Sequence, residues 1–359
     1  MTGRRTLAAL GVMMLALGGC SGQAGKGDTS AEQTATAKPA PKLGEPIPIE
    51  HEVWSVAITP DSRFAYVANP ESLTIVELAS RKVETIPFLS EGGKQVRFSR
   101  DGKQAYLAGN YTSGAVRFID TATRAETATV DVDSGPLSDL AVAPDGRHLY
   151  AVSAFPGLVR IDVRRQVVDL TVDLPDAEHE GIAVSPDGRW VYVTSAPAHS
   201  GGGPPINALT VVDATSGKVV KTLQLPGDRP DDVVVTPDGK RIFVSYATYE
   251  TTKPNFVSVL DAGSLAVVAK VPVTGRSYAM AITPDGRQLY VTGMDEKSVA
   301  DGTPGMDDLK PAIEVIDTTT NAVTSTVPLP SNSRDLEIAP NGHLAVVVDG
   351  NTLIPITLG

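Results

Sequence analysis

Twelve charged and aromatic residues stand a few positions ahead of short segments that resemble one another along the sequence. They are Trp54, Lys94, Asp139, His179, Glu180, Arg229, Asp231, Asp232, Arg276, Tyr278, Arg334 and Asp335. Mixed charges with two aromatic rings are residue types that can hold a small polar ligand in a pocket. Glu180 and the aspartates could instead supply oxygen ligands to Ca²⁺ or Mg²⁺. We take all twelve as candidates for a ligand-binding face, and we assign neither a catalytic residue nor a resident cofactor.

The single cysteine and the few histidines exclude several other kinds of site. Cys20 is the only cysteine, so the rest of the chain has no disulfide, thiolate metal site or cysteine nucleophile. The five histidines are scattered, and only His179 stands among the candidates. No Ser-His-Asp triad can be identified from spacing alone. The formal charge of −11, without a run of Lys or Arg, argues against a nucleic-acid partner.

A ten-residue segment recurs seven times in the chain. One copy reads Val184-Ser-Pro-Asp-Gly-Arg-Trp-Val-Tyr-Val193, and another reads Ile282-Thr-Pro-Asp-Gly-Arg-Gln-Leu-Tyr-Val291. The copies are marked by Asp61, Asp101, Asp145, Asp187, Asp238, Asp285 and Asn341, at spacings of 40, 44, 42, 51, 47 and 56 residues. That period is typical of the four-stranded blade of a β-propeller.

The chemistry of each copy supports this interpretation. In Pro-Asp-Gly the proline presets φ, the aspartate accepts bonds from nearby backbone, and the glycine takes a positive φ. The β-branched and aromatic runs on either side predict strands, and no stretch shows a sustained helical period. We predict an all-β fold over residues 43–359: a seven-bladed β-propeller with four antiparallel strands in each blade.

These segments resemble the YVTN, or YncE-like, family of β-propeller repeats. Tyr192-Val-Thr-Ser195 and Tyr290-Val-Thr-Gly293 come close to the strand that names the family, and Val315-Ile-Asp-Thr-Thr-Thr-Asn321 matches the second half of its repeat. The resemblance covers about residues 45–359. It implies the fold and leaves the activity open.

The seventh copy lacks its outer strand, because only one strand, Thr352–Leu358, follows its inner pair. We predict that residues 45–49 pair with residues 352–357 and close the ring, so that no sheet edge is left open. In the first strand of each blade, the residue two positions before the proline is large and the residue three positions before it is mostly small. These two positions face opposite sides of the strand, so we expect the large residues of one blade to pack over the small residues of its neighbour. Arg97 and Glu337 break this rule, which predicts either charges that line the central channel or a mutual ion pair.

Asp139, Asp232 and Asp335 occupy one position in three different blades. They could therefore satisfy local backbone N–H groups rather than bind a ligand. The other candidate surface comprises the long loops between the second and third strands of blades four, five and six. These loops, about 195–206 with His199, 246–255 and 293–311, should form a rim on one side of the channel mouth.

The first nineteen residues resemble a bacterial lipoprotein signal. Arg4 and Arg5 precede an apolar run, Leu7–Leu17, and Leu17-Gly18-Gly19-Cys20 matches the cleavage box. The resemblance implies that residues 1–19 are removed, that Cys20 is lipidated, and that 20–42 form a flexible linker. The protein would then be exported and anchored to a membrane, periplasmic or at the cell surface, and its charge would become −13.

Three functions remain open from the sequence. We favour a monomeric, non-catalytic envelope protein that presents its irregular loop face to a protein, a glycan or a small ligand. A lactonase-like hydrolase with a divalent ion at the channel mouth is the first alternative. An accessory subunit of a periplasmic quinoprotein-type redox complex is the second, and any cofactor would then lie on another chain.

Overall fold

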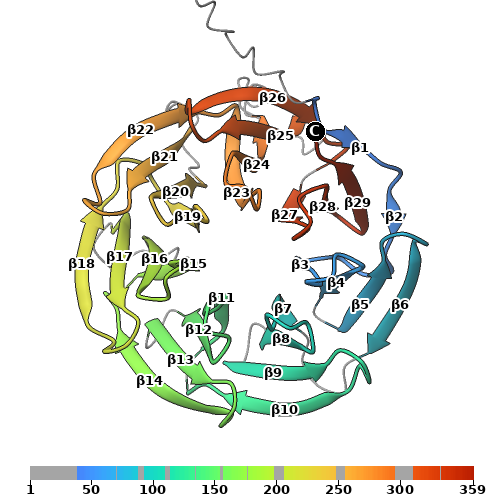
Figure 1. Ribbon diagram of the computed structural model, residues 1–359, viewed down its shortest axis with the longest axis horizontal. Helices are drawn as coiled ribbons and strands as arrows, with labels where there is room; N and C mark the ends of the chain where they lie inside the picture. The colour runs from blue at the N-terminus through green and yellow to red at the C-terminus, as the bar shows by residue number, and fades with distance from the viewer. Residues whose placement is uncertain are drawn as a thin grey trace, which may run out of the picture. The chain divides into compact units, whose positions relative to one another are not determined.

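The computed structural model describes residues 39–359, apart from 70, 88–92, 110–113, 134, 154–156, 176, 198–205, 248–254, 296–309 and 332. The expected signal peptide, most of the linker and the three long loops therefore lie largely outside the described residues. The described part of the chain contains no helix long and apolar enough to cross a membrane. Its elements are β-strands in seven sheets arranged as a ring (Figure 1).

Each sheet is a meander whose first strand lies nearest the ring axis. The innermost strands are β3 (Ser55–Ile58), β7 (Gly93–Phe98), β11 (Leu137–Val142), β15 (Glu178–Val184), β19 (Pro230–Val235), β23 (Gly275–Ile282) and β27 (Ser333–Ile338). The second strands are β4 (Phe64–Ala68), β8 (Gln104–Gly109), β12 (His148–Ser153), β16 (Trp190–Ala196), β20 (Arg241–Tyr246), β24 (Gln288–Asp295) and β28 (Leu344–Asp349). All pairings within a sheet are antiparallel, which confirms the predicted seven-bladed β-propeller.

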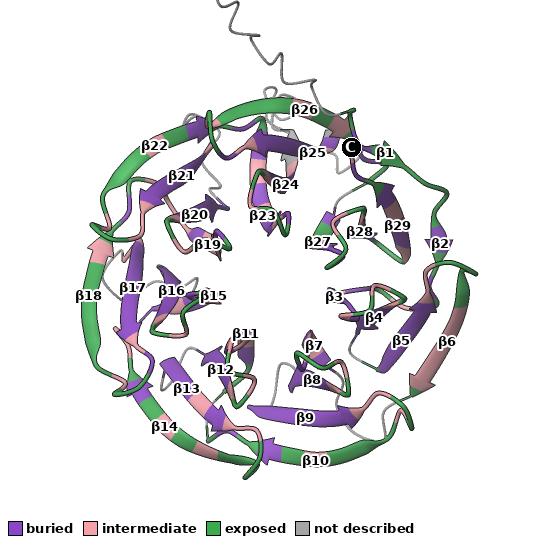
Figure 2. Cartoon of the chain, in the orientation of Figure 1, coloured by how far each residue is buried: buried purple, intermediate pink, exposed green. Residues whose placement is uncertain are grey.

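The outer half of each blade is formed by the third and fourth strands. The third strands are β5 (Ser72–Glu77), β9 (Ala115–Asp120), β13 (Gly157–Asp162), β17 (Ala208–Asp213), β21 (Phe256–Asp261), β25 (Lys310–Asp317) and β29 (Thr352–Thr357). Six outermost strands are β6 (Lys82–Pro87), β10 (Glu126–Asp131), β14 (Val167–Asp173), β18 (Val219–Gln224), β22 (Val267–Pro272) and β26 (Ala322–Pro328). Figure 2 shows that burial falls from the inner strands to these outer strands.

The seventh blade takes its outermost strand from the beginning of the described chain. β1 (Lys42–Leu43) pairs with Thr357 and Ile356 of β29, and β2 (Ile47–Pro48) pairs with Leu353 and Thr352. Between them, the Gly44 N–H donates to the carbonyl oxygen of Pro355 at 2.7 Å. The predicted closure is confirmed, and it begins earlier than expected, at Lys42 rather than at residue 45.

The repeated turns adopt the conformation that their sequence predicts. The Asp61 carboxylate accepts hydrogen bonds from the Thr59 hydroxyl at 2.6 Å and from the Arg63 N–H at 3.1 Å. Gly102, in the next blade, has a φ of 69°, which a side chain rarely tolerates. These short, regular turns lie on the face of the ring opposite the candidate residues.

Adjacent blades are joined by apolar cores built from the predicted large and small positions. Ala57 of the first blade shares a buried cluster with Phe98 of the second. Ala281 of the sixth blade shares another with Ile338 of the seventh. Small residues let the neighbouring sheet approach closely, so the inner strands reach the axis in a fixed orientation.

Candidate functional site

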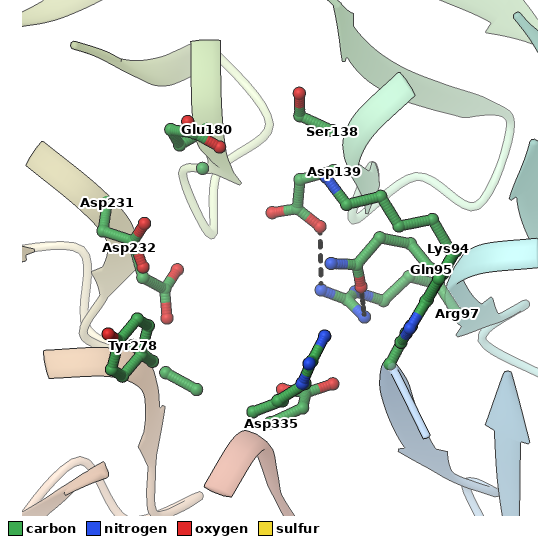
Figure 3. Close-up of a pocket in the computed structure, with 14 residues that line it drawn as sticks. Lys94, Gln95, Arg97, Ser138, Asp139, Glu180, Asp231, Asp232, Tyr278 and Asp335 are labelled. Atoms are coloured by element: carbon green, nitrogen blue, oxygen red, sulfur yellow. Dashed lines mark hydrogen bonds and ion pairs between the residues drawn. The ribbon is translucent and has the colours of Figure 1, made fainter. Parts of the chain in front are cut away.

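One residue from each blade lines the mouth of the central channel. In six blades this residue stands six positions before the proline of the repeated turn, and in the second blade Arg100 takes the place of that proline. In blade order the seven are Trp54, Lys94, Ser138, Glu180, Asp231, Tyr278 and Arg334. We call them the mouth ring. They surround a cavity of about 150 Å³ (Figure 3).

β-bulges turn these side chains toward the mouth. In the second blade the pairing of β7 with β8 passes from Gly93 directly to Gln95 and leaves Lys94 without a partner residue. The sixth and seventh blades skip Tyr278 and Arg334 in the same way. A bulge inserts an extra residue into a strand and re-aims its side chain. Interrupted pairing of this kind therefore places the mouth residue in six of the seven blades, whereas Trp54 of the first blade stands directly before β3.

The structure brings nine of the twelve candidate residues to this cavity and places three outside its lining. His179 comes just before the bulge, is completely buried, and its Nδ1 lies 2.9 Å from the Ser195 hydroxyl. Arg229 donates to Glu178 at 3.0 Å and to the carbonyl oxygen of Pro197 at 2.9 Å. Arg276 is the third candidate that lies outside the lining of the cavity. The placement corrects the expectation that His179 stands at the mouth, because its side chain points into the core.

Five lining residues were absent from the candidate list. They are Gln95, Arg97, Ser138, Gly181 and Ala279. Ser138 could have been found by counting six positions back from its proline, as in the other blades. Gly181 carries no side chain, yet an added Cβ would lie 2.6 Å from the carbonyl oxygen of Asp231. Because Gly181 has no side chain, the fifth blade can approach the fourth closely.

Three aspartates one position deeper than the mouth ring join neighbouring blades. The Asp139 carboxylate accepts from its own blade at the Leu140 N–H, 2.7 Å, and from the next blade at the Ile182 N–H, 3.2 Å. Asp232 bonds in the same way to Val233 and Met280, and Asp335 to Leu336 and Val56. We call these the inter-blade aspartates. The suggestion that they satisfy backbone N–H groups holds, and Asp335 links the last blade to the first.

Arg97 places a positive charge among these carboxylates. Its Nη2 lies 3.0 Å from Asp139 Oδ1, and its Nη1 donates to Gln95 Oε1 at 3.2 Å. Burial alone would lower the pKa of Arg97. The surrounding carboxylates, of which Asp139 has the largest effect, raise this pKa by more than burial lowers it, so the net shift is upward. Arg97 and the inter-blade aspartates line both the mouth cavity and a deeper one of about 320 Å³ that also contains Glu337. Arg97 and Glu337 both line the channel as predicted, but Arg97 forms its ion pair with Asp139.

The acidic side of the channel is poorly compensated. Burial, followed by the charges of Glu180 and Asp232, raises the pKa of Asp231 well above its usual range. Burial and the charge of Asp139 raise the pKa of Asp232 to about 7. Burial likewise raises the pKa of Glu337 to about 7, although Arg97 opposes the shift. Each carboxyl would release its proton more readily if another cation entered the channel.

The clustered oxygen and nitrogen ligands expected of a metal site are found elsewhere. In the described part of the chain, one group of three has ligand atoms within 4.8 Å of one another: His148, Asp162 and Asp169. Arg160 already pairs with Asp169 at 2.8 Å, which disfavours a cation there. At the mouth, the inter-blade aspartates accept two backbone bonds each. The Ca²⁺ or Mg²⁺ ion stays a prediction without added support, and so does the rim of long loops, whose central residues with His199 are not described.

Comparison with known proteins supports the fold and gives one relative of limited coverage. No family model matches the chain. Hydrazine synthase subunit beta of Kuenenia stuttgartiensis is 30% identical in an alignment 114 residues long, which covers 26% of this chain and 30% of that protein. The solved structure of Kuenenia stuttgartiensis hydrazine synthase superposes with a TM-score of 0.71 at 19% identity and covers 92% of this chain and 99% of that chain. The chain thus matches less than a third of the relative's sequence, and the structural likeness concerns the fold.

Proposed function

We propose that this protein is a non-catalytic binding propeller that holds a small polar ligand in its mouth ring. The observation that supports this most is the mouth ring itself: six bulged positions, together with the residue directly before β3, carry seven residues of different chemistry around one cavity. On the opposite face, the turns of five blades repeat one contact, a hydrogen bond from a Thr or Ser hydroxyl to the aspartate of the turn. Variation confined to one face of a rigid scaffold is typical of a binding surface.

This proposal is tested by ligand-induced stabilisation of the full chain, purified in detergent. The low-molecular-mass fraction of an extract from the source cells should raise the melting temperature, because a ligand that binds only the folded state stabilises it. The double variant Trp54→Ala, Tyr278→Ala should lose this response. Lys240→Ala, on the turn face with a side chain 79% exposed, is the matched control and should keep it. Equal responses from all three proteins, or no response from the unaltered one, would overturn the proposal.

An accessory role in a redox complex is a second candidate. It is favoured by the partial match to a protein named as the beta subunit of hydrazine synthase. Affinity capture of the full chain from detergent-solubilised membranes should then retrieve a haem- or quinone-containing partner in constant proportion. Capture of the propeller alone under mild detergent would contradict this second role and leave the first unaffected.

We further propose that the chain belongs to the YVTN-like propellers and is tethered through a lipid on Cys20. The Leu-Gly-Gly-Cys box and the linker that follows it support the tether. Metabolic labelling with an alkyne fatty acid should mark the unaltered protein and not Cys20→Ser. The variant should also move to the soluble fraction. Labelling of both proteins would contradict the anchor.

A further inference from the structure

The charges of the mouth ring are separated by blade. The fourth and fifth blades contribute the acids Glu180 and Asp231, whereas the second and seventh contribute the bases Lys94 and Arg334. In a ring of seven, blades four and five lie across the axis from blade one and its two neighbours. Figure 3 shows Lys94 on the side of the cavity opposite Asp231. The mouth therefore has a negative side and a positive side.

Neither side is neutralised by a close partner across the cavity. Glu180 lies 3.9 Å from Arg229, at the limit of an ion pair. Lys94 has no carboxylate within ion-pair distance among the residues that the structure describes. Arg334 contacts Glu52 at 2.6 Å, but both side chains are more than half exposed, so water competes for this pair. A bound ligand could thus compensate charges that the protein leaves facing the cavity.

Aromatic rings accompany both charged sides. Tyr278 belongs to the sixth blade, next to Asp231 of the fifth, and Trp54 belongs to the first blade, between the two basic ones. An ammonium group is attracted to the face of an aromatic ring as well as to a carboxylate. A cavity of about 150 Å³ suits a ligand of roughly six to ten non-hydrogen atoms, since a comparable cavity can hold benzene.

We infer that the mouth ring binds a small zwitterion, a molecule with an ammonium group and a carboxylate separated by a short chain. This inference rests on the proposed binding function and names its ligand class. The ammonium group faces Asp231 and Glu180 with Tyr278 beside it, and the carboxylate faces Lys94 and Arg334. A simple cation would leave the two bases uncompensated, and a simple anion would be repelled by the two acids.

The experiment uses ω-amino acids of increasing length, from glycine to 5-aminovalerate, with butylammonium and butyrate as the separate halves. Binding to the full chain in detergent is measured by calorimetry and by melting temperature at constant ionic strength. One chain length should bind best, and at least about tenfold more tightly than either half. Lys94→Gln should weaken the best zwitterion at least about tenfold without weakening butylammonium, and Asp231→Asn should weaken it as much without weakening butyrate. Lys103→Gln, 81% exposed on the turn face, should leave every ligand unchanged.

Two outcomes overturn the inference. One is a series in which no zwitterion binds more tightly than its halves. The other is a best ligand whose affinity both mouth variants leave intact. The metabolite-fraction test then separates this failure from a failure of the binding function. If the fraction still stabilises the unaltered protein and not the Trp54, Tyr278 variant, the mouth binds another class of ligand.

Discussion

Shortening a single side chain in the strand that closes the ring should destabilise the whole domain. Ile47 and Ile49 are each 2% exposed and pack in one cluster with Val346, Val348 and Leu353 of the last blade. Replacing a buried isoleucine by alanine costs about 2–5 kcal/mol, because apolar burial is lost and a cavity remains. We therefore expect Ile47→Ala to lower the free energy of unfolding by about 3 kcal/mol, a large part of the roughly 5–15 kcal/mol of a typical domain.

The assay is urea unfolding of the full chain in detergent, followed by tryptophan fluorescence. The matched control is Val268→Ala on β22, where the side chain is 56% exposed and the change should stay within about 0.5 kcal/mol. The double variant Ile47→Ala, Ile49→Ala should lose more than either single variant, although not the full sum, because the two residues share one cluster. An Ile47→Ala protein as stable as the control would refute the reasoning that this strand completes the hydrophobic core.

Three further changes test the channel. The rise in the pKa of Glu337 from 4.5 to about 7 means that its folded-state proton stabilises the protein below about pH 4.5 and is lost as the pH rises through 7. The stability of Glu337→Gln relative to the unaltered protein should therefore increase by about 1–3 kcal/mol as the pH rises from 5 to 8. A difference in the free energy of urea unfolding that does not change with pH would contradict this. Asp139→Asn should cost about 2–3 kcal/mol in the same assay, because Arg97 loses its ion-pair partner and a backbone N–H loses its acceptor, whereas a loss under about 0.5 kcal/mol would count against the inter-blade role. Gly181→Ala should cost about 1–3 kcal/mol, because its Cβ would lie 2.6 Å from a backbone oxygen of the next blade, while Gly135→Ala, with no heavy atom within 4 Å of the added Cβ, should be nearly neutral by thermal melting.

The fold could be predicted because each blade carries a recognisable local sequence pattern. The Pro-Asp-Gly turns carry their own hydrogen bonds, and the large and small residues near the axis alternate within a few positions. Ring closure followed from counting strands, since the seventh copy was one short. Its start was placed too late because β1 is only two residues long and is separated from β2 by residues 44–46.

The candidate site could be predicted only in part, because a bulge shifts the pleat by one residue. His179 and Glu180 are neighbours in sequence, and alternation alone cannot say which of them faces the mouth. The structure turns Glu180 to the cavity and His179 into the core. Arg97 was recognised as an exception, but its partner was not, because Asp139 lies 42 residues away in the next blade. The spacing of the repeats shows which position in each blade varies, but only the strand register in the structure shows which way the side chain at that position points.

The bulges also bear on how such a protein can diversify. Six of the seven mouth residues stand where the ladder between the first two strands is interrupted, so their side chains lie outside the alternation that fills the apolar interior. Replacing one of these side chains should therefore leave the apolar packing between neighbouring sheets unchanged. Proteins that evolve from this chain could therefore acquire new ligand selectivity by point substitutions at the mouth-ring positions. The same positions could be varied in a combinatorial library without redesigning the rest of the propeller.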